Sequence, residues 1–224
     1  MRKLQISQGE YYHVFNRGND KQKIFLNKTD YARFLFLILH LQANQSFPNA
    51  GRHVKHFVRH SVFNIEPKIV ARIVAEKQVE LLGFALMPNH FHLILGEKTE
   101  GGIARYMQKV LNAYTKYFNT RYDRSGHLFQ GPYKAVHIKD NDHLLYASAY
   151  VHRNCCDLPG WRGKENSYLW SSLQDYVLQN RWADNLLDQN LIRGQFAAPQ
   201  EYRDWVATSG AKESDDFELA GNHC

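Results

Sequence analysis

Hydrophobic and polar positions along the first 180 residues follow two periods, one typical of strands and one typical of helices. Four short segments rich in apolar side chains and bounded by turn formers are predicted strands: residues 11–15, 79–87, 90–96 and 133–138. Segments with apolar side chains at three- and four-residue intervals are predicted helices: residues 31–45, 67–78, 103–122, 140–153 and 172–179. Thr29 or Asp30 is placed to cap the first helix.

The main elements follow the order strand, helix, strand, strand, helix, strand, helix, without regular βαβ alternation. This order predicts an α+β fold in which helices pack on a mainly antiparallel sheet. Residues 1–180 are expected to form one domain. Residues 181–224 are expected to form a C-terminal extension whose acidic end, from about Gly210, is flexible.

Composition narrows the range of partners. The 224 residues carry a net charge of +6, which favours a polyanionic partner. No stretch approaches the roughly 20 apolar residues that span a bilayer, and the N-terminal sequence lacks the apolar core of a secretory signal. Cys155 and Cys156 are adjacent and Cys224 is the last residue, so no disulfide framework is visible. We expect a reduced, cytoplasmic setting, no membrane partner and no structural zinc site.

Candidate chemistry is concentrated in MPNHFHLIL, residues 87–95. On a strand, His90 and His92 project from the same face and could hold one metal ion. Taken alone, such a pair is more often two half-exposed histidines. Tyr150 and Asn154 lie one turn apart near the end of a predicted helix, where an amide oxygen could ligate a metal beside a phenol nucleophile. That pair is also ambiguous, because helices often carry tyrosines in the core and end at asparagine caps.

Five ordered blocks between about residues 10 and 180 make a more specific pattern. They are YYHVFNRGNDKQKIF, LLGFALMPNHFHLIL, YMQKVLNAYTKYFNTRYDRSGHLFQGPYKA, YASAYVHRNC and YLWSSLQDY. Together they resemble the single-tyrosine, single-strand DNA transposases and their relatives, the REP-associated tyrosine transposases. Two features depart from the family. Asn154 is followed by Cys155 and Cys156 where relatives often have proline and valine, and residues 46–78 form a longer, basic insertion.

The resemblance implies a ferredoxin-like HUH nuclease architecture and a role for each matched residue. It implies that His90, His92 and Asn154 bind Mg²⁺ or Mn²⁺ and that Tyr150 is the catalytic nucleophile. Ligand preference alone leaves Zn²⁺ open, and no general base for the phenol is evident in the motif. The implied activity is that of a metal-dependent single-strand DNA endonuclease and strand transferase. It acts on hairpin-containing DNA through a 5′-phosphotyrosine and leaves a free 3′-OH.

Several alternatives stay open at this point. The chain could be a domesticated hairpin-binding protein without full transposition activity, a relaxase-like nicking enzyme, or an unrelated metallohydrolase that uses the two histidines. The expected partner is single-stranded or hairpin DNA, and the expected location is the cytoplasm, in association with the nucleoid. Relatives suggest that a homodimer is an option, with Tyr150 acting in its own chain or in a partner chain.

Residues that contact DNA are predicted from charge and position. The candidates are Asn16, Arg17, Lys109, Lys116, Arg121, Arg124, Lys134 and Arg153. The alternative for each is a solvated basic surface. Tyr133, Trp161 and Trp170 could stack on unpaired bases, although core packing is favoured for the tryptophans. The RHVKHFVRH run, residues 52–60, has a poor hydrophobic pattern and is expected to contact DNA or to be an exposed loop.

Two other tyrosines are rivals of Tyr150 as the nucleophile. Tyr114 lies on the apolar face of its predicted helix, so we expect it in the core. Tyr146 lies one turn before Tyr150 and is expected to neighbour the site.

Overall fold

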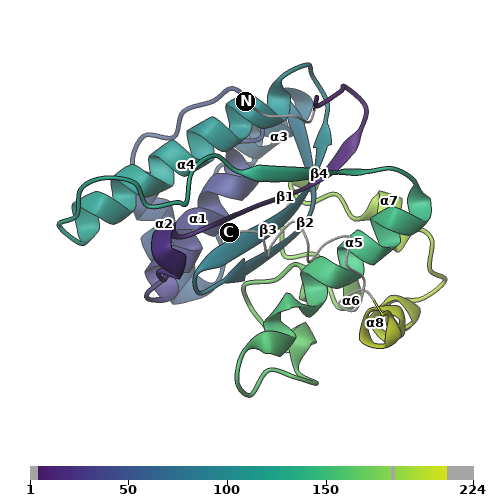
Figure 1. The fold of residues 1–224 in the computed structure, drawn as a ribbon. Coiled ribbons are helices and arrows are strands. Elements are labelled where there is room, and N and C mark those ends of the chain that lie inside the picture. The colour runs from purple at the N-terminus through teal and green to yellow at the C-terminus, as the bar shows by residue number, and fades with distance from the viewer. Residues whose placement is uncertain (1–4, 183–184, 211–224) are drawn as a thin grey trace.

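A four-stranded antiparallel sheet separates two layers of helices (Figure 1). The computed structural model describes residues 5–182 and 185–210. The strands are β1 (Tyr11–Arg17), β2 (Val79–Met87), β3 (His90–Glu97) and β4 (Lys134–Ile138). Their order across the sheet is β2-β3-β1-β4. The predicted α+β class is confirmed, and the order is that of a ferredoxin-like split βαβ fold.

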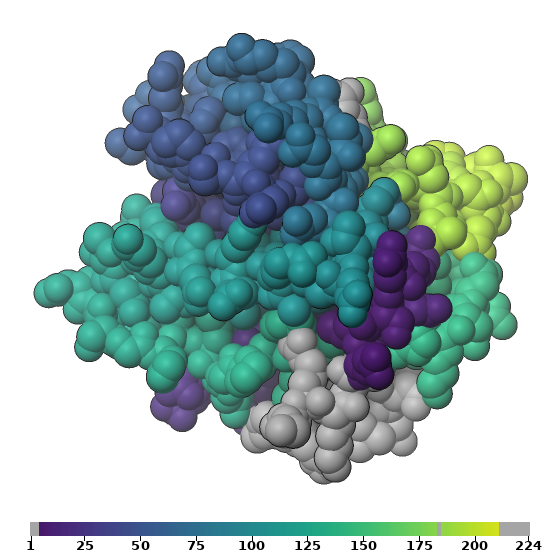
Figure 2. Space-filling view, turned by 90° about the horizontal axis from the view of Figure 1, so that it is seen from above, coloured from purple at the N-terminus to yellow at the C-terminus, as the bar shows by residue number. Residues whose placement is uncertain are grey.

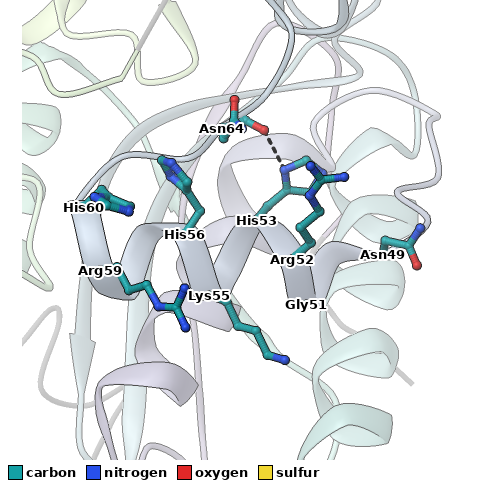
Figure 3. A pocket seen from close by; sticks show the side chains of 9 residues that line it. All are labelled: Asn49, Gly51, Arg52, His53, Lys55, His56, Arg59, His60 and Asn64. Atoms are coloured by element: carbon teal, nitrogen blue, oxygen red, sulfur yellow. Dashed lines mark hydrogen bonds between the residues drawn. The ribbon is translucent and has the colours of Figure 1, made fainter.

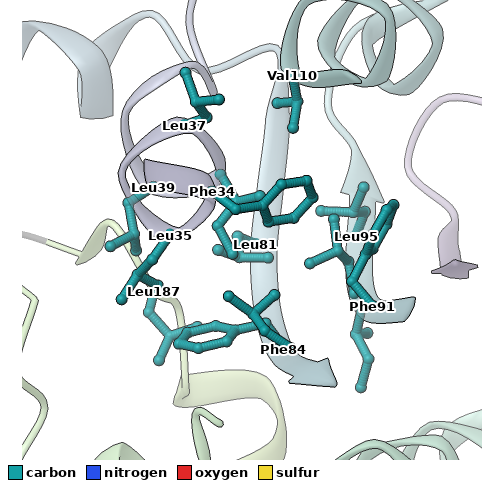
Figure 4. Close-up of a cluster of buried hydrophobic side chains, with 14 of the residues drawn as sticks. Phe34, Leu35, Leu37, Leu39, Leu81, Phe84, Phe91, Leu95, Val110 and Leu187 are labelled. Carbon is teal, nitrogen blue, oxygen red and sulfur yellow. The ribbon is translucent and has the colours of Figure 1, made fainter. Parts of the chain in front are cut away.

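Helices α1 (Lys28–His40) and α4 (Gly102–Arg121) pack together on one face of the sheet. Figure 4 shows their apolar side chains meeting those of β2 and β3. The Phe34 ring of α1 lies 4.8 Å from the Phe91 ring of β3, centroid to centroid. The apolar face of α4 is buried at Ile103, Tyr106, Met107, Val110, Tyr114 and Phe118 and half-buried at Leu111. This burial of apolar area is the main force that holds the layer to the sheet.

The start of α1 differs from the prediction. Asn27 is the cap: its side chain accepts from the backbone N–H of Thr29, while the carboxylate of Asp30 accepts from the N–H of Asn27. Neither Thr29 nor Asp30 is therefore the capping residue, because the reciprocal capping box needs its acid three positions after the cap. The helix also ends at His40 rather than at residue 45.

Asp30 joins α1 to the end of α4. Its fully buried carboxylate accepts hydrogen bonds from the hydroxyls of Tyr117, at 2.8 Å, and Tyr122, at 2.7 Å. It also accepts from the backbone N–H groups of Leu26 and Asn27, and Arg121 lies 3.6 Å away. A buried carboxylate is tolerated because both of its oxygens accept hydrogen bonds and a cation lies nearby.

The basic segment after α1 forms two helices. For residues 52–60 the sequence left a DNA contact or an exposed loop open and did not predict a helix, whereas the helix predicted at residues 67–78 is present. Helix α2 (Ala50–His60) packs on α1, and α3 (Pro67–Ala75) follows it. Val54 and Phe57 are buried, whereas Arg52, Lys55 and Arg59 are exposed. Only one narrow stripe of α2, formed by Ala50, Val54 and Phe57, is buried, so the helix has few apolar residues although they share one face. Figure 2 shows this part of the chain as a rounded lobe beside α4.

Helix α5 (Asn141–Arg153) lies across β2, β3 and β4 on the opposite face of the sheet. It is followed by the short 3-10 helix η2 (Asn154–Asp157). Two further 3-10 turns are η1 (Asn19–Lys21) and η3 (Glu165–Ser167). The chain then forms α6 (Leu173–Val177), α7 (Asn190–Arg193) and α8 (Pro199–Thr208). The pattern of the sequence predicted α6 but gave no sign of α7 and α8.

Residues beyond 180 contribute to the same core. Leu187 is fully buried against side chains of α1 and β2 (Figure 4), and the N–H of Asp188 donates to the carbonyl of Leu81. The flexible end expected from about Gly210 lies outside the described residues. No helix among the described residues is long and apolar enough to cross a membrane.

Replacing Asp30 by alanine is expected to destabilise the protein strongly. Two tyrosine hydroxyls and two backbone N–H groups would lose their acceptor, which is expected to cost about 3 kcal/mol or more of unfolding free energy. Urea unfolding followed by circular dichroism measures the change. Asp142→Ala, which removes an exposed carboxylate, is the matched control and should change stability by less than about 1 kcal/mol. Equal effects of the two variants would contradict the assigned role of Asp30.

His40 is expected to make stability depend on pH. Burial among Phe36, Phe47 and Phe63 lowers its pKa from 6.5 to about 4. Below pH 6.5, His40 of the unfolded chain therefore binds a proton, whereas His40 of the folded chain stays neutral. The free energy of unfolding then falls with pH until the folded pKa is reached. Between pH 7 and pH 4.5 the loss is about 2–3 kcal/mol.

The measurement is urea unfolding of wild type and His40→Gln at both pH values. Glutamine can still donate to the Phe36 carbonyl, as His40 does, but it does not titrate, so the variant should lose less stability on acidification. His127→Gln, at an exposed position, is the control and should follow wild type. A pH dependence unchanged in His40→Gln would show that His40 is not the responsible group.

Candidate active site

His90 and His92 share one face of β3, as their spacing predicts. His92 lies opposite Phe15 of β1 and His90 lies opposite Arg17. Phe91 points to the other face, where it packs against Phe34. The two imidazole rings are perpendicular, with centroids 5.0 Å apart. They lie on the sheet face that α5 covers. Helix α5 also carries Tyr150, the nucleophile that the family resemblance implies.

A third histidine, which the sequence did not single out, completes this cluster. His13 of β1 is buried, and its Nε2 lies 2.8 Å from Nδ1 of His92. Burial lowers the pKa of His13 from 6.5 to about 3, so the ring is neutral. A neutral His13 that accepts through Nε2 makes His92 donate from Nδ1, which turns the lone pair of His92 Nε2 toward any ligand. The run YYHVF, residues 11–15, predicts a strand that contains His13. The register of this strand against β3, which brings His13 to His92, cannot be obtained from local sequence.

Helix α5 places Tyr150 beside the histidine cluster. Its ring is half-buried, and its centroid lies 5.6 Å from that of His92 and 5.6 Å from that of His13, both edge-on. The position of α5 is fixed two residues later by His152, whose Nδ1 lies 2.6 Å from the hydroxyl of Tyr202 and whose Nε2 lies 2.7 Å from Oγ of Ser172. The phenol is therefore presented by a helix that is anchored on both sides.

Asn154 lies where α5 ends. It is the C-cap of the helix and the first residue of η2. Its side chain is buried, and its Nδ2 donates to the carbonyl of Tyr150 at 2.8 Å. This hydrogen bond leaves the amide oxygen as the atom that can ligate a metal. The helix ends at Arg153, as predicted, directly before Asn154, Cys155 and Cys156.

The donor set suits a divalent cation. Nδ1 of His90 lies 2.7 Å from Oδ1 of Asn89, and Nδ1 of His92 is engaged by His13. Both rings would therefore ligate through Nε2, with the other nitrogen held by a polar partner, which is the usual arrangement in metal sites. No three His, Cys, Asp or Glu side chains are arranged to hold a metal within residues 5–182 and 185–210. A third protein ligand has to be another group, for which the Asn154 amide oxygen is the candidate.

The rival tyrosines have other environments. Tyr114 is fully buried and its hydroxyl donates to the carbonyl of Ile24 at 2.5 Å, so the expected core role is confirmed. Tyr146 is 40% exposed and its ring packs against that of Trp205 on α8. Tyr150 is the one of the three whose ring contacts the histidines.

Two of the aromatic side chains considered for base stacking pack against other rings. Trp170 stacks on Tyr31 at 4.7 Å, and Trp161 lies edge-on to Tyr168 at 4.9 Å. Both tryptophans are half-buried against the core, as favoured from the sequence. Tyr133 is buried at the edge of a groove of about 910 Å³ between α4 and the chain that leads into β4.

The eight predicted DNA-contacting residues lie in different surroundings. Contacts with other protein groups within the fold hold several of them, among them Asn16, Lys109, Arg121, Arg124 and Arg153. Asn16, for example, is buried and joins the Gly131 carbonyl to the N–H of Arg17. The positions of Arg17, Lys116 and Lys134 in the fold indicate which part of a DNA each could contact. Lys134 lies opposite Phe15, which in turn lies opposite His92. Arg17 and Lys134 therefore border the histidines, whereas Lys116 lines the groove beside α4.

His13→Ala is expected to weaken metal binding by about 10–100-fold, because loss of such an outer hydrogen bond leaves His92 free to rotate and to change tautomer. Calorimetric titration with Mn²⁺ measures the affinity. His13→Gln, which keeps an acceptor near His92, should retain most of it. The matched control is His40→Ala, which removes a buried histidine from the other face of the sheet and should leave the affinity unchanged. Equal affinity in wild type and His13→Ala would refute the role of His13.

Comparisons with known proteins bear on the family of the chain. Residues 52–154 match a family model described as "Transposase IS200 like". This segment contains His90, His92, Tyr150 and Asn154. One solved structure, of a REP-associated tyrosine transposase bound to a REP hairpin, is 14% identical, with 88% of this chain and 94% of that chain covered and a TM-score of 0.49. No curated protein matches the chain. On this match, residues 52–154, slightly under half of the chain, are similar to the IS200-like transposases.

Proposed function

We propose that the protein is a metal-dependent single-strand DNA endonuclease and strand transferase of the REP-associated type. The observation that carries the proposal is the position of Tyr150, whose ring lies 5.6 Å from both His92 and His13 on the covered face of the sheet. A phenol beside an imidazole pair suits phosphoryl transfer, in which a nucleophile attacks a phosphorus held by a cation. The family match supports the same chemistry.

In this proposal each residue has a defined task. His90, His92 and Asn154 would hold Mg²⁺ or Mn²⁺. When bound, the ion polarises a phosphate oxygen and offsets the charge that builds up in the transition state. Asn89 and His13 orient the two imidazoles through their Nδ1 atoms. Arg17 and Lys134, which border the histidines, would contact the flanking phosphates, and Lys116 would contact DNA in the groove beside α4.

The covalent step is carried by Tyr150. Its phenolic oxygen forms a bond to phosphorus while the bond from phosphorus to the 3′ oxygen breaks. The phenol loses its proton and the departing 3′ oxygen gains one, so the products are a 5′-phosphotyrosine and a free 3′-OH. A second 3′-OH can then attack the phosphotyrosine and restore both the phosphodiester and the tyrosine. Bond energy is conserved in the adduct, so no nucleotide cofactor is needed.

The substrate we propose is a DNA hairpin with an unpaired flank, from the resemblance of the five sequence blocks. Tyr150 contacts His92 of its own chain, which supports catalysis within one subunit, with or without dimerisation. With DNA as the substrate, the reaction would take place in the cytoplasm, in association with the nucleoid.

Tyr150→Phe is expected to abolish a covalent protein–DNA adduct. The assay mixes protein with end-labelled single strands from the flanks of its own gene, with Mg²⁺ or Mn²⁺, and resolves adducts on a denaturing gel. Wild type should form the adduct with the metal and lose it on chelation. Tyr146→Phe is the matched control, because its ring packs on Trp205 instead of the histidines, and it should retain the adduct.

The outcomes separate the candidate functions. An adduct that persists in Tyr150→Phe would overturn the assigned nucleophile. Tight hairpin binding without any adduct in wild type would favour a domesticated hairpin-binding protein. Hydrolysis of small phosphate or amide substrates without DNA binding would favour a metallohydrolase.

A further inference from the structure

Helix α2 concentrates the positive charge of the chain. Residues 31–65 contain four Lys or Arg side chains and no Asp or Glu, and this segment alone accounts for +4 of the net charge of +6. Three of the four cations, Arg52, Lys55 and Arg59, are exposed on α2. Their spacing of three and four residues puts them on one face of the helix, opposite the buried Val54 and Phe57.

Within the described part of the chain, these three cations lack the ion pairs that hold several other cations of the protein. No carboxylate lies within ion-pair distance of Arg52, Lys55 or Arg59 among residues 5–182 and 185–210. On the neighbouring α3, by contrast, Lys68 pairs with Glu66 at 2.7 Å and Arg72 pairs with Glu76 at 3.1 Å. Like charges one turn apart repel each other and destabilise a helix by a few tenths of a kcal/mol. A bound polyanion would attract all three cations and offset the repulsion between them.

Three histidines extend the same surface. His53, His56 and His60 line a surface hollow of about 760 Å³ together with Arg52, Lys55 and Arg59, and no acidic residue lines it. Figure 3 shows His53 and His56 pointing toward the loop that carries Asn64, and Lys55 and Arg59 extending away from it. Nδ1 of His53 lies 2.7 Å from the carbonyl of Asn64, and Nδ1 of His56 lies 2.9 Å from that of Val62. These contacts hold both rings in place and direct Nε2 away from the loop.

Contacts connect α2 to the end of the sheet that carries the candidate site. Phe57 lies 6.3 Å from Trp170, ring to ring, and the carbonyl of Trp170 accepts from the N–H of Leu86 on β2. Met87, the next residue, lies opposite His90. The basic helix is therefore near the end of the edge strand β2, where the chain turns into β3 at His90. A DNA whose cleaved phosphate is at the histidines could continue along the surface to α2.

We infer that α2 is a second DNA-binding element, which holds the phosphate backbone of the double-helical stem of the substrate. This inference rests on the proposed function. The stem is favoured over an unpaired strand because the aromatic rings near the cations, those of Phe57 and Phe36, are buried. No Phe, Tyr or Trp is among the described residues that line the hollow, and these are the larger rings on which unpaired bases usually stack. Cations without stacking partners bind phosphates and carry no base preference.

The test is the salt dependence of hairpin binding by the triple variant Arg52→Gln, Lys55→Gln and Arg59→Gln. The probe is a synthetic DNA hairpin with an unpaired tail, in EDTA so that nothing is cleaved. Each lost phosphate contact lowers the slope of log affinity against log salt by about 0.9, so the slope should fall by about 2–3. Affinity at about 0.1 M salt should fall by about 10- to 100-fold, roughly equally for stems of any sequence.

The matched control is Lys68→Gln, Arg72→Gln and Lys98→Gln. It removes the same charge, but each of these cations already pairs with a carboxylate, so the slope should stay near that of wild type. Circular dichroism checks that both variants fold. An unchanged slope in the α2 variant, or an equal loss in the control, would overturn the inference.

Two further outcomes identify what has failed. Vesicles containing phosphatidylglycerol provide a competing anionic surface. If wild type binds them through the α2 cations and hairpin binding is unaffected by the variant, α2 serves a membrane and the inference is wrong. If wild type forms no Tyr150 adduct with the hairpin in Mn²⁺, the proposed function fails, whereas a normal adduct with an unchanged salt slope rejects only the role of α2.

Discussion

The antiparallel pairing of β1 with β3 determines where every residue of the candidate site lies. In this register Phe15 is opposite His92 and Arg17 is opposite His90. Side chains of these two central strands then divide between an apolar face against α1 and α4 and a face that carries the histidines. A slip of one residue would exchange the faces and put the imidazoles among aromatic rings. The packing that excludes such a slip is the same packing that keeps the histidines together.

The second requirement is a firm position for α5. Its buried His152 contacts Ser172 and Tyr202 through the two ring nitrogens, and burial lowers the pKa of this histidine to about 3, so both contacts are made by a neutral ring. Tyr202 belongs to α8, far along the chain from the sheet. The C-terminal helices therefore help to position the helix that presents Tyr150, in addition to enlarging the core.

Charge is distributed according to the same architecture. Cations close to the packed layers are held by protein groups, as Arg121 is beside the buried Asp30. The cations of α2 extend from a helix that touches the rest of the protein through one apolar stripe only. A helix at the periphery can carry unbalanced charge because water screens it, whereas the interior cannot. The charge of α2 therefore lies on the side of the helix that faces away from the core.

The sequence by itself determined the local periods and the relations that these periods impose on neighbouring residues. It located the strand at residues 79–87 and the apolar face of α4, placed His90 and His92 on one side of a strand, and put Tyr150 and Asn154 one turn apart. Local spacing fixes these relations, because strands and helices have constant periods.

Only the tertiary structure decided which residues meet across elements. His13 is 79 positions from His92 in sequence, and nothing in a local pattern sets the register that joins them. Helix α2 escaped prediction because its narrow apolar stripe has meaning only against α1, and the cap of α1 proved to be Asn27 because the capping box uses Asp30 as its acid. Long-range pairing and packing, which depend on the whole chain at once, made these choices.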